Sequence, residues 1–157
     1  MKNSELSQLA RDFFDYKDGK LFWNQNRRPR IKKGDRAGTI DQYGYRKIGI
    51  NGKYYLEHRL IYAYHNPHWD GVDEIDHING VRDDNQIENL RVVTSQENNF
   101  NNTKARGYYW NKRDKKWTAQ IAVNRKKKFL GYFDKEEEAH QAYLKAKEKL
   151  HIIEDRK

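Results

Sequence analysis

Apolar residues recur at helical spacing near the N-terminus and at strand spacing farther along the chain. A helix is predicted over residues 4–16, with Ser4 as its N-cap. Its apolar face consists of Leu6, Leu9, Ala10 and Phe13. The pattern then predicts a strand at Lys20–Trp23, a hairpin of Tyr45–Ile50 and Lys53–Glu57 around Asn51-Gly52, and a helix at His58–Tyr64.

The last third of the chain has a different pattern, that of three short strands and one helix. The strands are predicted at Gly107–Trp110, Lys116–Val123 and Lys127–Phe133, and the helix at Lys135–Leu150 with Asp134 as its cap. Period two places Trp117, Ala119, Ile121 and Val123 on the face toward the helix, and Thr118, Gln120, Ala122 and Asn124 on the other. The polar segment 101–104 separates the two patterns, which predicts domains at 1–102 and 103–157.

Composition excludes several classes of protein. The chain has no Cys, so it has neither disulfides nor a structural zinc site built from thiolates. No apolar run approaches the length of a membrane span, and the N-terminal residues do not resemble a signal peptide. These features favour a cytoplasmic protein.

Positive charge is concentrated at the C-terminal end. Residues 1–102 hold 16 Lys and Arg against 15 Asp and Glu, whereas residues 103–157 hold 16 against 8. Such a basic block suits a nucleic acid or an anionic membrane surface, although a merely solvated basic face is the alternative.

A cluster of Asp, His and Asn residues lies between the two patterns. Asp76 and His77 are adjacent, so on a strand their side chains point to opposite sides. Leu90–Val93 is predicted as a second strand. Thr94 is expected to cap a helix beginning at Ser95, which puts Asn98 in or near its first turn and Asn102 one turn later.

This segment resembles the HNH nucleases, and in its Asp-His pair, Asn89-Leu90 and Asn98 it resembles the phage and intron-type homing endonucleases. The resemblance implies a ββα-metal fold over about residues 72–102. It implies that Asp76 and Asn98 hold one divalent cation, magnesium or manganese, that His77 is the general base, and that Asn89 braces the hairpin loop and orients His77. Oxygen ligands suit these hard cations, and imidazole suits proton transfer at neutral pH. His58, before a predicted helix, is interpreted as structural, and a role in the site is the alternative.

The C-terminal segment resembles the AP-two domain of plant ethylene-response factors over about residues 105–151. The matching stretches include Arg106-Gly107-Tyr108, Lys116–Ile121 and Leu130–Asp134. The resemblance implies a three-stranded antiparallel sheet packed on one helix, with the sheet in the DNA major groove. It places DNA contacts at Arg106, Tyr109, Asn111, Arg113, Gln120, Lys127 and Phe129.

The sequence therefore predicts an α+β protein of two parts, a metal-dependent and site-preferring DNA endonuclease of phage or mobile-element type. Its partner is double-stranded DNA and not a membrane. We expect a monomer or weak dimer that nicks DNA, because each chain has one active site. The alternative is a non-catalytic, sequence-specific DNA-binding regulator. A third class, RNA-binding proteins, lacks support because no RRM-like aromatic signature is present.

Overall fold

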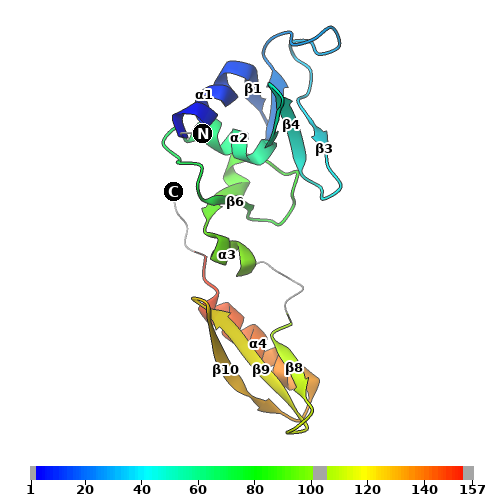
Figure 1. The fold of residues 1–157 in the computed structure, drawn as a ribbon, viewed down its shortest axis with the longest axis vertical. Helices are drawn as coiled ribbons and strands as arrows, with labels where there is room; N and C mark the ends of the chain where they lie inside the picture. Colours follow the sequence, from blue (N-terminus) through cyan, green and yellow to red (C-terminus); the bar gives the residue numbers. More distant parts are fainter. Residues whose placement is uncertain (1–2, 101–105, 154–157) are drawn as a thin grey trace. The chain divides into compact units, whose positions relative to one another are not determined.

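The computed structural model describes residues 3–100 and 106–153. The fold is α+β, with small antiparallel sheets and four α-helices in the described residues (Figure 1). The chain divides into two compact units, the first running to Val93 and the second beginning at Thr94. The sequence predicts the division at 102/103 instead, within the 101–105 segment that lies outside the described residues. The difference concerns one helix, which the structure groups with the second unit.

The first unit opens with a helix and a hairpin. Helix α1 spans Asn3–Phe13, and strands β1 (Phe14–Lys17) and β2 (Lys20–Trp23) pair around Asp18-Gly19. The helix predicted through residue 16 therefore ends at Phe13. Asp18 and Gly19 both have positive φ, the conformation of a tight hairpin turn, and this turn draws the preceding residues into the sheet. Phe14 is buried in the core as a result.

A second sheet and a second helix complete the core of this unit. Strands β3 (Thr39–Ile40), β4 (Arg46–Ile50) and β5 (Lys53–Leu56) are antiparallel, and β4 and β5 join at Asn51-Gly52 as predicted. Helix α2 (Glu57–His65) follows at once and packs against α1. The buried core is apolar and includes Ala10, Phe14, Leu21, Trp23, Ile48, Ile50, Leu60 and Ile61.

Two further strands end the first unit. Strand β6 (Glu74–His77) pairs antiparallel with β7 (Leu90–Val93), and the short 3-10 helix η1 (Ile87–Asn89) precedes β7. Asp76 lies opposite Arg91, and His77 lies opposite Leu90. Ile75, Leu90 and Val92 join the core. This burial anchors the strands that carry the Asp-His pair.

The second unit contains helix α3 (Ser95–Phe100), strands β8 (Tyr108–Asn111), β9 (Lys116–Val123) and β10 (Lys126–Phe133), and helix α4 (Glu136–Leu150). The strands form one antiparallel sheet with β9 in the centre, and α4 packs against it. Ala119 and Ile121 of β9 are buried, as are Ala139 and Tyr143 of the helix that packs against this strand. The predicted sheet-on-helix arrangement is thus present.

The predicted cap of α4 is wrong. Lys135 occupies the N-cap position and makes no capping bond through its side chain. Asp134 instead forms an ion pair with Lys116 at the start of β9. A carboxylate before a helix can bind either the first backbone N–H groups of the helix or a neighbouring cation. Here the pairing of β9 with β10 brings Lys116 close to Asp134.

Among the described residues, none of the helices combines the length and the apolar character that crossing a membrane requires.

Candidate functional site

His77 lies at the end of β6, with a side chain that is only 5% exposed. Its Nε2 is 2.7 Å from Oδ1 of Asn85, which is buried in the loop that follows β6. The rings of His77 and His58 meet edge to face with 5.0 Å between their centres, and Tyr45 lies on the same side. The candidate base is therefore held in a fixed orientation by surrounding side chains.

His58 is neutral in this setting. Burial, followed by the nearby His77 and Arg59, lowers the pKa of His58 from 6.5 to about 3. A neutral ring beside His77 adds no positive charge to that group at neutral pH. The sequence-based interpretation of His58 as structural agrees with this packing, which brings it into contact with the candidate base.

Asp76 is held by an arginine from the opposite strand. Nη2 and Nε of Arg91 donate to Oδ2 of Asp76 at 2.8 and 3.1 Å. This ion pair follows from the register, which places the two residues directly across from each other. It holds the carboxylate in a fixed orientation at the same strand end as His77.

Asn89 joins the two sides of the loop between β6 and β7. Its Oδ1 accepts from the backbone N–H of Asn79 at 3.0 Å, and its Nδ2 donates to Oδ1 of Asn79 and to the carbonyl of Asp84. Its own carbonyl accepts from the N–H of Ile78, the residue after His77. The side-chain bond to the His77 ring, however, comes from Asn85.

Asn98 lies on α3, in the second unit. The helix begins with a reciprocal cap: the N–H of Glu97 donates to Oγ1 of Thr94, and the N–H of Thr94 donates to Oε2 of Glu97. The predicted cap and start are therefore confirmed, and Asn98 is in the first turn. Asn102, the other predicted position on this helix face, lies outside the described residues.

A divalent cation requires donor groups that lie close together. Within residues 3–100 and 106–153, no three His, Asp or Glu side chains gather in a way that could hold a metal ion. The predicted set needs only the Asp76 carboxylate and the Asn98 amide oxygen. Their chemistry fits a hard cation with most of its coordination sphere open to water and phosphate.

One face of the C-terminal sheet carries exposed aromatic side chains together with the half-buried Gln120 and the buried Thr118. The register places Tyr109 and Tyr132 on either side of Thr118, and Phe129 opposite Gln120. Phe129 and Tyr132 are three residues apart and share this face because the register shifts between Phe129 and Gly131. Their rings lie 4.9 Å apart and both are more than half exposed. Lys127, opposite Ala122, lies on the same face.

The other predicted DNA-binding residues lie at the edge of this sheet. Arg106 is exposed just before β8. Asn111 closes the turn after β8 by accepting from the N–H groups of Arg113 and Asp114. The Arg113 side chain is 91% exposed and pairs with Asp114. The structure thus brings Tyr109, Gln120, Lys127 and Phe129 together on one face, with Asn111 and Arg113 in the adjoining turn.

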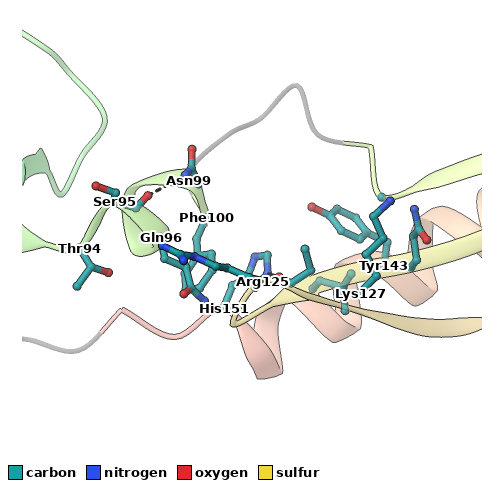
Figure 2. A pocket seen from close by; sticks show the side chains of 13 residues that line it. Thr94, Ser95, Gln96, Asn99, Phe100, Arg125, Lys127, Tyr143 and His151 are labelled. Atoms are coloured by element: carbon teal, nitrogen blue, oxygen red, sulfur yellow. Dashed lines mark hydrogen bonds between the residues drawn. The ribbon is translucent and has the colours of Figure 1, made fainter.

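The second unit also contains a cavity of about 810 Å³, shown in Figure 2. It is lined by residues of α3, β9 and β10 together with Tyr143 and His151. Phe100 stacks on His151 with 4.0 Å between ring centres, and Gln96 donates to Asn124. Gln120 and Lys127 line this cavity as well.

Sequence reasoning missed three residues that orient the candidate site. The sequence pattern assigns no role to Asn85, and it places Glu57 at the end of one predicted strand and Arg91 within another. Cross-strand pairing with Asp76 was the signal available for Arg91. The contact of Glu57 and Asn85, which are 28 positions apart, has no local signal.

Comparison with known proteins identifies a family match in the segment that carries the candidate site. Residues 55–100 match the model of an HNH endonuclease family, HNH_3. No curated protein and no solved structure matches the chain. HNH nucleases generally use a divalent metal ion and bind DNA. The match supports an HNH nuclease domain in the segment that carries Asp76, His77, Asn89 and Asn98.

Proposed function

We propose that this protein is a metal-dependent, site-preferring DNA endonuclease of the homing type. The observation that carries the proposal is the arrangement at the end of β6, where an oriented histidine and an arginine-paired aspartate adjoin a loop braced by asparagine. This arrangement lies within the segment that matches the HNH endonuclease family.

The reaction is hydrolysis of a phosphodiester. His77 takes a proton from a water molecule, whose oxygen forms a bond to phosphorus while the bond from phosphorus to the leaving sugar oxygen breaks. A magnesium or manganese ion held by Asp76 and Asn98 would supply positive charge for the phosphate and the leaving oxygen. Asn89 keeps the loop after His77 in place. One such site per chain is expected to cut one strand in each binding event.

The C-terminal sheet is proposed to select the DNA site. Residues 103–157 hold 16 basic against 8 acidic residues, which favours contact with phosphates. On this face Tyr109 and Phe129 are exposed and Gln120 is half-buried, and such side chains are able to contact base edges. The likeness to AP-two domains supports an approach through the major groove.

A plasmid assay tests the nuclease. Supercoiled DNA is incubated with the full chain and a series of magnesium or manganese concentrations, with chelator as the control. We expect relaxed circles to accumulate with either metal and none to form with chelator. Tight binding without any nicking across the series would reject the nuclease and leave the DNA-binding regulator as the function.

A further inference from the structure

Three buried polar side chains form a hydrogen-bonded chain that ends at His77. Glu57 at the start of α2 is fully buried, and Asn85 is 1% exposed. Nδ2 of Asn85 donates to Oε2 of Glu57 at 2.8 Å, and its Oδ1 faces Nε2 of His77 at 2.7 Å. Polar groups so deeply buried are costly unless every bond is made, so the direction of each bond is strongly constrained.

The contacts of Glu57 determine which group donates and which accepts in these hydrogen bonds. Arg36 donates to both carboxylate oxygens, and the backbone N–H of Leu21 donates to Oε1 at 3.0 Å. A carboxylate paired with a guanidinium is ionised and only accepts. Asn85 must therefore turn its NH₂ group toward Glu57 and its oxygen toward His77.

The amide oxygen of Asn85 can only accept, so Nε2 of His77 must carry the proton that it receives. We propose that Glu57 and Asn85 are positioning residues that hold His77 in the tautomer with its proton on Nε2 and its lone pair on Nδ1. Nδ1 is then the atom that takes the proton from water. This inference rests on the proposed function for the role of His77, but the tautomer itself follows from the hydrogen bonds.

The substitution Glu57→Gln tests the direction of the chain with almost no change of shape. A glutamine whose oxygen stays with Leu21 and Arg36 turns its NH₂ group toward Asn85. Asn85 then meets a donor, and rotating its amide would present NH₂ to His77, which forces the proton from Nε2 to Nδ1. Asn85→Leu is a second variant, which removes the acceptor altogether. Glu88→Gln is the matched control, the same chemical change at an exposed glutamate in the same region.

The readout is the tautomer of His77, measured by long-range ¹H–¹⁵N correlation spectra of the full chain without metal. Spectra are taken at about pH 8, above the ordinary histidine pKa of about 6.5. We expect Nε2–H in the wild type and in Glu88→Gln, and a shift toward Nδ1–H in Glu57→Gln. Asn85→Leu is expected to give a mixture. Nδ1–H in the wild type, or an unchanged tautomer in both test variants, would overturn the proposal.

Plasmid nicking by the same proteins connects the tautomer with catalysis. We expect kcat to fall by roughly 10²-fold or more in Glu57→Gln and Asn85→Leu, with KM for DNA unchanged, because a misplaced proton removes the base without removing binding. An altered tautomer with an unchanged kcat would overturn the positioning role. If the wild type does not nick DNA at all, the proposed function fails, while the spectra still decide whether Glu57 and Asn85 set the tautomer.

Discussion

At the scale of single residues, the candidate site depends on partners outside its motif. Arg91 holds Asp76 from the opposite strand, and Asn85 holds the ring of His77. The side-chain amide of Asn89 is used within the loop, where its Nδ2 donates to Asn79 and to the carbonyl of Asp84. Asp76, His77 and Asn89 therefore each have a restricted orientation, which catalysis by these groups would require.

Replacing His77 tests the general base. His77→Ala should reduce nicking by roughly 10²- to 10⁴-fold, because a base in the transition state contributes about that much. Affinity for DNA should stay nearly unchanged, since the base acts on water. Nicking and binding are measured side by side, with the exposed His68 replaced by alanine as control. Wild-type rates for His77→Ala over a pH series would show that the assignment is wrong.

The two proposed metal ligands should contribute unequally to metal affinity. Asp76→Ala and Asn98→Ala should both raise the metal concentration needed for half-maximal nicking, and Asp76→Ala should raise it more. The reason is that a carboxylate brings a net charge to the ion, whereas an amide brings only a dipole. Titration of magnesium or manganese measures this. A silent Asn98→Ala together with a damaging Asn102→Ala would place the ligand one helical turn later.

The lowered pKa of His58 leads us to expect that the folded protein loses stability in acid. In the unfolded chain this histidine takes up a proton near pH 6.5, whereas burial delays protonation in the folded protein to about pH 3. Between these values the unfolded state binds more protons than the folded state. The contribution of His58 to the free energy of unfolding is therefore complete above pH 6.5 and is lost as the pH falls toward 3. The loss from this residue is about 1.4 kcal/mol per pH unit.

Urea unfolding of wild type and His58→Met, compared at several pH values between about 4 and 7, checks this expectation. The variant lacks the titrating ring, so its free energy of unfolding should depend less steeply on pH. Parallel curves for the two proteins would mean that His58 is protonated in the folded state.

At the scale of helices and strands, turns and bulges decide what the local pattern leaves open. The positive φ of Asp18 and Gly19 ends α1 early by pairing the residues after Phe13 with β2. The irregularity between Phe129 and Gly131 places two aromatic side chains on one face of the C-terminal sheet. Gly107, just before β8, also contacts β9, because its backbone carbonyl accepts from the N–H of Gln120.

Gly107→Ala should destabilise the second unit more than its backbone angle alone explains. Gly107 has φ of +69°, and a Cβ there would meet the ring of Tyr143 at 1.9 Å. Gly52 has φ of +78° with nothing within 4 Å, so Gly52→Ala isolates the backbone strain. We expect about 1–2 kcal/mol for Gly52→Ala and a larger loss for Gly107→Ala. Equal losses in chemical unfolding would show that Tyr143 does not occupy this space.

At the scale of the whole molecule, charge and chemistry are separated along the chain. The first 102 residues are nearly neutral and carry the proposed catalytic groups, while the remainder carries most of the positive charge. The second unit, from Thr94, combines α3 with the basic sheet and its helix. We therefore expect affinity and selectivity for DNA to come mainly from the C-terminal residues.

Removing residues 103–157 should leave a weak and poorly selective nuclease that retains α3 and Asn98. Each lost phosphate contact should reduce the slope of log affinity against log salt by about 0.9 for duplex DNA. Intact and truncated proteins are compared on a selected site and on random duplex over a salt series. Equal affinities and equal slopes would show that these residues do not contact DNA.

Within the C-terminal sheet, base-reading and phosphate-binding residues should behave differently. Arg113→Ala and Gln120→Ala should blur the preference for the selected site, because such side chains meet base edges. Lys126→Ala and Lys128→Ala should weaken binding to all sequences alike, because a lysine on phosphate carries no base information. Binding to the selected and random duplexes measures both. An equal loss of affinity for both duplexes in Gln120→Ala would show that Gln120 does not contact base edges.

The sequence by itself determined most of the elements and the residues worth testing. The Asn51-Gly52 hairpin, the capped start of α3 and the sheet-and-helix pattern of the last third depend on neighbouring residues, and local geometry carries such signals. The Asp-His pair and the spaced asparagines pointed to the segment that the family match covers. Their roles remain predictions, for which the experiments above are designed.

Only the tertiary structure decided how the candidate base is held. Glu57 begins a helix and Asn85 lies in a loop, and nothing near either residue in the chain indicates their contact. They meet because α2 and the strand pair β6–β7 share one core, where buried polar groups must find partners among whatever the fold brings close. The end of α1 and the pairing of Asp134 with Lys116 have the same origin, because strand pairing overrides a local preference for helix or cap.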